Sequence, residues 1–134
     1  MIGNRIALSL FSSMVFAFAP TLAPAAGDGE WRVYSEETNG DVYFFDASRI
    51  KGTANLHRVW TRIRYKTSVM GASSYQSLLE VDCSERTQRI LQRTFFSDGH
   101  WGEPAMSTDT REKPKRPIVE NSAAARLSEI LCEQ

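Results

Sequence analysis

Residues 56–66 alternate strictly between two kinds of side chain, and this pattern constrains the fold more than any other part of the chain. Successive side chains of a β-strand point to opposite faces, so the alternation predicts one long strand with two different faces. One face is mostly uncharged, and the other is basic with a single tryptophan. The first consists of Val59, Thr61, Ile63 and Tyr65, and the second of Arg58, Trp60, Arg62, Arg64 and Lys66.

Upstream of this strand, a turn signal separates two more strand candidates. Residues 31–37 and 42–45 flank Asn39-Gly40, which predicts a hairpin because both turn residues accept positive φ. Residues 46–49 are typical of a capped turn, with Asp46 bonded to nearby backbone amides.

Downstream, residues 67–74 are expected to form a flexible loop around Gly71. Residues 75–82 and 87–96 are predicted to pair as a hairpin, which places Glu80 opposite Arg89. A short last strand is expected within residues 105–110, before a polar connection that prolines interrupt.

One helix is predicted at the end of the chain. Asn121 or Ser122 can cap it, and its apolar positions form a single stripe. The stripe consists of Ala123, Ala124, Leu127, Ile130 and Leu131. The predicted fold class is therefore α+β: an antiparallel sheet of about five or six strands with one C-terminal helix packed on one face.

The first 25 residues have the layout of a secretory signal peptide: a short positive start at Arg5, an uncharged apolar run over residues 6–19, and a small-residue cleavage motif ending at Ala25. A permanent membrane anchor is the alternative, but a spanning helix needs ~20 apolar residues. We predict cleavage after Ala25, which leaves residues 26–134 as one domain in an exported protein.

The charges and cysteines narrow the function further. The sequence has 16 Lys and Arg against 16 Asp and Glu, which argues against a nucleic-acid-binding protein. Cys83 and Cys132 are the only cysteines, and in an exported protein such a pair predicts a disulfide between strand and helix. Two buried free thiols are the alternative.

The order of several motifs resembles the bacterial surface-adhesin protein E family. The matching blocks are Asn39-Gly40-Asp41-Val42-Tyr43-Phe44-Phe45-Asp46 with Ser48 and Ile50, Arg58-Val59-Trp60 with Tyr65-Lys66, Glu80 with Asp82-Cys83 and Glu85-Arg86, and a closing helix that ends in Cys132. The resemblance covers residues 31 to 132. It implies a small antiparallel sheet, a strand-to-helix disulfide, an extracytoplasmic location and, for the namesake members, adhesion to host extracellular-matrix proteins.

This chain departs from the namesake type in one respect. That type is a lipoprotein at the outer surface, whereas no lipid-acceptor cysteine follows the predicted signal here. Periplasmic, secreted and cell-surface locations therefore all stay open. A soluble periplasmic structural or envelope-interaction protein with no host ligand is the alternative to an adhesin.

The basic strand face is the candidate binding site. Cations around an aromatic ring suit an anionic glycan or an acidic matrix protein, and the tentative binding residues are Arg58, Trp60, Arg62, Arg64 and Lys66. The alternative is a solvated face whose charges pair with neighbours such as Glu80.

Other chemistry has weaker support in the sequence. The only histidines, His57 and His100, are 43 positions apart and lie in no metal-ligand motif, so no metal or cofactor is expected. Asp46, Ser48 and His57 could be combined into a triad, but no nucleophile elbow is present. The sequence therefore predicts a non-enzymatic binding protein.

Overall fold

The computed structural model describes residues 29–102 and 104–133. The predicted signal peptide lies outside these residues and stays a prediction. The described chain forms the strands β1 Trp31–Glu36, β2 Val42–Asp46, β3 Lys51–Gly52, β4 Leu56–Val69, β5 Ala72–Asp82, β6 Thr87–Phe96, β7 Ser107–Asp109 and β8 Arg116–Pro117, followed by the helix α1 Ala123–Cys132.

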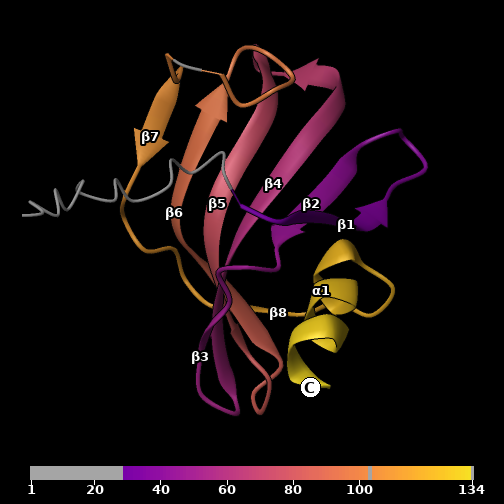
Figure 1. Cartoon of the computed structure of the whole chain (residues 1–134), viewed down its shortest axis with the longest axis vertical. Coiled ribbons are helices and arrows are strands. Elements are labelled where there is room, and N and C mark those ends of the chain that lie inside the picture. Colours follow the sequence, from indigo (N-terminus) through magenta and orange to yellow (C-terminus); the bar gives the residue numbers. More distant parts are fainter. Residues whose placement is uncertain (1–28, 103, 134) are drawn as a thin grey trace, which may run out of the picture.

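The strands form one antiparallel sheet in the order β1-β2-β4-β5-β6-β7, with β3 paired to β4 and β8 paired to β6 (Figure 1). The predicted α+β fold is confirmed. Six strands make the continuous path, and the two that the sequence did not predict, β3 and β8, have only two residues each. Elements this short show no periodicity, which is why alternation could not reveal them.

The predicted loop over residues 67–74 is wrong. β4 continues to Val69 and β5 begins at Ala72, so only Met70 and Gly71 form the turn. Both turn residues have positive φ, at 50° and 84° respectively, as a two-residue hairpin turn requires. Met70 is almost fully exposed, so the tip of this hairpin presents an apolar side chain to solvent.

The helix α1 begins and packs as the sequence predicts. The Ser122 side chain accepts a hydrogen bond from the backbone of Ala125 and caps the helix. Leu127 and Leu131 are fully buried against Val59 and Val81 of the sheet. Within the described residues, no helix is long and apolar enough to cross a membrane.

The disulfide is also confirmed. Cys83, just after β5, is bonded to Cys132 in the last turn of α1, with Cα atoms 5.7 Å apart. This excludes the alternative of two free thiols. The bond closes a segment with a sequence separation of 49 and ties the helix to the sheet.

The two faces of the sheet differ in what covers them. We call the face that packs against α1 the helix face; it carries Val59, Leu79 and Val81. The opposite face, which we call the outer face, carries the basic side chains that alternate with these residues along β4. The candidate site lies on this outer face.

Candidate functional site

A shallow basic hollow lies on the lower half of the outer face. It has a volume of about 230 Å³ and is lined by Arg49, Lys51, Arg58, Trp60 and Leu78. Trp60 and Leu78 are directly opposite each other on β4 and β5, so they form an apolar floor between the cations. We call this feature the basic hollow.

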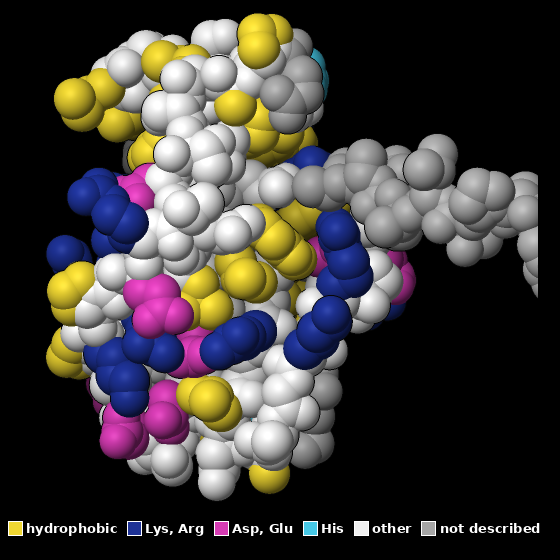
Figure 2. All heavy atoms as spheres, turned by 90° about the vertical axis from the view of Figure 1, so that its left-hand side faces the viewer, with side chains coloured by type: hydrophobic (Ala, Val, Ile, Leu, Met, Phe, Trp, Pro, Cys, Tyr) yellow, Lys and Arg dark blue, Asp and Glu magenta, His cyan; other side chains and the backbone are white. Residues whose placement is uncertain are grey.

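Strand pairing aligns the charges across the sheet rather than along one strand. Lys51 pairs with Arg58, Arg58 with Glu80, and Glu80 with Arg89, so four strands contribute one residue each to a single row. Directly paired residues point to the same face, and neighbouring strands are ~4.8 Å apart. Figure 2 shows Lys and Arg side chains in a band across this part of the molecule. We call these four residues the charged row.

Glu80 is the only acidic member of the charged row, and it is fully engaged. Its side chain is 4% exposed and accepts hydrogen bonds from Arg58 Nε at 2.9 Å and Arg89 Nε at 2.8 Å. Burial alone would raise the pKa of Glu80, but the hydrogen bonds from the two arginines outweigh burial and lower it. The carboxylate therefore fixes the two guanidinium groups in place without being available to a partner. The predicted Glu80–Arg89 pair is confirmed.

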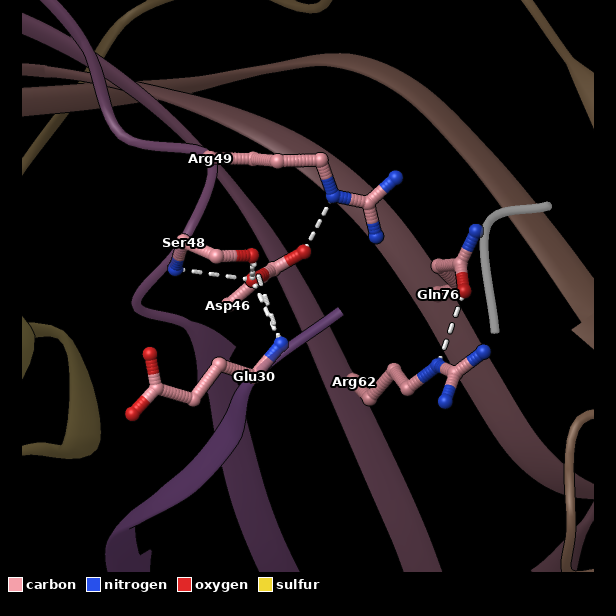
Figure 3. A network of polar contacts seen from close by, with 6 residues as sticks. All are labelled: Glu30, Asp46, Ser48, Arg49, Arg62 and Gln76. Atoms are coloured by element: carbon pink, nitrogen blue, oxygen red, sulfur yellow. Dashed lines mark hydrogen bonds and ion pairs between the residues drawn. The ribbon is translucent and has the colours of Figure 1, made fainter. Parts of the chain in front are cut away.

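Arg49 is held at the rim of the basic hollow by a second buried carboxylate, that of Asp46. Asp46 is completely buried and receives the backbone N–H groups of Glu30 and Ser48, the Ser48 hydroxyl at 2.6 Å, and the Arg49 Nε (Figure 3). Burial opposes ionisation of Asp46, but the bonds from Ser48 and Arg49 lower its pKa. Asp46 and Ser48 thus act as turn-capping residues, as the sequence indicates, and they orient Arg49.

Lys51 completes the hollow from the short strand β3. It is exposed, and within the described part of the chain its ammonium group forms no ion pair. Arg58 is 53% exposed although its Nε is bonded to Glu80. The hollow therefore combines cationic groups that reach solvent with the ring of Trp60, an arrangement that suits sulfate or carboxylate groups.

Arg62, on the same strand face, is placed differently. It is 8% exposed, its guanidinium lies 4.1 Å from the Trp31 ring centre and 4.6 Å from that of Trp101, and its Nε donates to Gln76 at 2.8 Å. Figure 3 shows Arg62 and Arg49 reaching in the same direction toward Gln76. Burial first, and then the nearby Arg49 charge, lowers the pKa of Arg62. Arg62 therefore lies inside the protein and has no free surface to offer a large partner.

The other two residues of the predicted stripe lie farther up β4. The guanidinium of Arg64 is 5.5 Å from the ring centre of Phe44, and Lys66 lies beside the turn at Gly40. The structure thus separates the predicted stripe into an accessible pair at the basic hollow, Arg58 and Trp60, a buried arginine, and two cations next to β2.

Residues 31–133 match the sequence pattern of surface-adhesin protein E. The chain belongs to the surface-adhesin protein E family. The family resemblance expected from the motifs is confirmed.

Solved structures of protein E from Haemophilus influenzae share the fold. Crystal form II of that protein has a TM-score of 0.59 and 12% identity over 86% of this chain and 94% of that chain. Protein E from a non-typeable strain also has a TM-score of 0.59, with 11% identity over 86% of this chain and 81% of that chain. At such low identity the likeness shows the fold alone. No curated protein matches the sequence.

The sequence did not point to three of the residues that line the basic hollow: Arg49, Lys51 and Leu78. Arg49 was interpreted only as part of a turn, and Lys51 as part of a loop. For Arg49 and Lys51, the one available signal was their position: two cations shortly before the long basic strand can fold back beside it. Leu78 is ordinary in a strand pattern and gave no signal.

The metal site and the triad, which the sequence did not favour, can also be compared with the structure. Within residues 29–102 and 104–133, no group of three or more His, Cys, Asp or Glu side chains is placed to hold a metal ion. Asp46 and Ser48 bond to each other and to the turn after β2, while His57 lies in β4 opposite Gly52 and Val81 with its Nε2 buried.

Proposed function

We propose that the chain is an exported, non-enzymatic binding protein that adheres to host extracellular matrix through anionic groups carried by matrix proteins or their glycans. Residues 1–25 act as its cleaved signal peptide. The observation that carries the proposal is the basic hollow: three cations surround Trp60, and the two nearby carboxylates are buried and already bonded. Membership of the surface-adhesin protein E family supports the adhesive role.

Binding should be electrostatic in origin and weaken with salt. Cations at an exposed surface attract sulfate or carboxylate groups over a distance of about 10 Å at 0.1 M ionic strength, and higher salt shortens that range. The Trp60 ring adds a contact that salt affects less. Affinity for immobilised heparin, used as a sulfated probe, should therefore fall steeply between low and high salt but not vanish.

The test uses a matched pair of charge reversals. Lys51→Glu places a negative charge in the basic hollow, whereas Arg32→Glu makes the same change on β1, where Arg32 pairs with Phe45 and so points to the helix face. We expect Lys51→Glu to weaken heparin binding about tenfold and Arg32→Glu to change it less than about twofold. Equal effects of the two variants would contradict the assignment of the hollow.

Location is tested separately by treating intact cells with a protease. Digestion on intact cells supports the adhesive role, since an adhesin has to reach the outside. Protection until the outer membrane is opened would favour the alternative, a periplasmic structural or envelope-interaction protein. The hollow would then bind an anionic component of the envelope rather than host matrix.

A further inference from the structure

A second concave surface extends from the helix face, beside the start of α1, to the edge of the sheet at β6. It consists of two hollows, of about 180 Å³ and about 370 Å³, that share Gln88 and Ile90 as lining residues and so meet over β6. Figure 1 shows α1 beside the lower half of the sheet, with the β1–β2 hairpin above it. We call the two hollows together the helix-side groove.

One end of the helix-side groove is aromatic and uncharged. Tyr34, Tyr43 and Tyr75 converge there from three strands, and Ala123 and Ala124 of α1 form the opposite wall. The rings of Tyr34 and Tyr43 pack edge to face with centres 5.8 Å apart. Burial raises the pKa of both phenols, so their hydroxyls stay protonated at neutral pH. This end suits an apolar side chain with a hydrogen-bonding rim.

The other end is basic. Arg93, Lys113 and Arg111 all face one carboxylate, that of Asp109, while Arg116 forms no ion pair within the described part of the chain. The hydrogen bonds from Arg111 and Lys113 hold the pKa of Asp109 far below its usual range. Three cations thus share the Asp109 carboxylate, and Arg89, which also lines this end, is paired with Glu80 and Glu112. With Arg116, the cations at this end outnumber the carboxylates.

Two buried polar atoms in side chains that line the groove have no hydrogen-bond partner. Gln88 Oε1 and Arg93 Nε are buried, and neither takes part in a hydrogen bond. Most buried polar groups are hydrogen-bonded, so two unused groups in side chains that line the same groove point to a ligand that would engage them.

We propose that the helix-side groove binds an extended acidic segment of a partner protein. An aromatic or aliphatic side chain of that segment lies between the tyrosines and α1. A carboxylate following it lies against Arg93 and Arg116, and the amide of Gln88 pairs with the backbone between them. A uniformly charged glycan fits less well, because it would leave the uncharged tyrosine end without a matching group.

The test is an NMR titration of the ¹⁵N-labelled protein with the capped tetrapeptide Phe-Gly-Glu-Glu. We expect shifts at the backbone amides of Gln88, Arg93, Ala123 and Ala124, with weak but saturable binding. Two control peptides change one end each: Phe-Gly-Lys-Lys removes the negative charge, and Ala-Gly-Glu-Glu removes the ring. Both should bind at least about tenfold more weakly, since each loses one of the two contacts.

Variants assign the two ends of the groove. Arg116→Glu should weaken binding of Phe-Gly-Glu-Glu several-fold, and Ala123→Leu should narrow the tyrosine end and do the same in a folded protein. Lys51→Glu on the outer face should leave it unchanged, so this proposal and the proposed adhesive function fail independently. Equal binding of all three peptides, shifts confined to the outer face, or stronger shifts of the same amides by a heparin tetrasaccharide would overturn it.

Discussion

Two arginines on the same face of β4 have opposite surroundings. Arg58 and Arg62 are four positions apart, and each hydrogen-bonds a side chain of β5 through its Nε. Arg58 is 53% exposed and borders the basic hollow, whereas Arg62 is 8% exposed and lies between two tryptophan rings. The alternation along the strand is the same at both positions, so the difference comes from what lies above the sheet.

Coverage of the upper half comes from distant segments. Trp31 belongs to β1, and Trp101 lies after β6, held by its backbone N–H to the Ser74 hydroxyl and by its Nε1 to the Tyr75 carbonyl. Over the lower half, β4 is flanked by β3, which has only two residues. A basic strand face is therefore structural where side chains from other segments cover it, and available for binding where they do not.

The largest expected effect lies away from both arginines, at the disulfide. Replacing Cys83 and Cys132 together by Ala should lower the free energy of unfolding by about 3 kcal/mol, mainly because the unfolded chain gains freedom. Urea unfolding of the variant and the oxidised parent measures this. The outer face should keep its structure in the folded variant, so heparin binding should survive; its loss would mean that the two faces are not independent.

Substituting the two arginines tests the comparison itself. Arg62→Ala should cost about 2–3 kcal/mol, because it removes two cation–π contacts and leaves the buried Gln76 side chain without its partner. Arg58→Ala should cost less than about 1 kcal/mol, since its pair with Glu80 is partly exposed and Arg89 still neutralises the carboxylate. Urea unfolding curves of both variants measure these costs. Equal losses of unfolding free energy would contradict a structural role for Arg62 and an exposed, binding role for Arg58.

A smaller effect should appear as a pH dependence at Glu80. Its pKa is lower in the folded protein than the ~4.3 of an unfolded Glu. Ionised Glu80 therefore contributes stability above that unfolded value, and the contribution disappears as pH falls through the folded pKa. The difference in unfolding free energy between the parent and Glu80→Gln should shrink as the pH is lowered from 6 to 3. A difference in unfolding free energy that stays constant over this range would show that the charge of Glu80 does not stabilise the charged row.

Much of the fold could be predicted from the sequence because its signals are local. Alternation along residues 56–66, the hairpin at Asn39-Gly40 and the Ser122 cap depend on neighbouring residues alone, and each is confirmed. Of the two turn residues, only Gly40 has positive φ. The turn at Met70-Gly71 was missed because its residues are not those of the strongest hairpin signals.

The candidate site could be predicted only in part. Arg58 and Trp60 were found from their alternation, but the burial of Arg62 depends on Trp31 and Trp101, which are 31 and 39 positions away. The charged row depends on the register between strands, which fixes Lys51 beside Arg58. A local sequence pattern contains no information about the burial of Arg62 or about the register that forms the charged row.

The most direct test uses the three tryptophan indole N–H signals of the ¹⁵N-labelled protein. Trp60 lies in the basic hollow, whereas Trp31 and Trp101 cover Arg62 on the upper half of the same face. On titration with a heparin tetrasaccharide, we expect the Trp60 signal to shift, the other two signals to stay in place, and added salt to reverse the shift. Shifts of Trp31 and Trp101 without Trp60 would contradict this expectation.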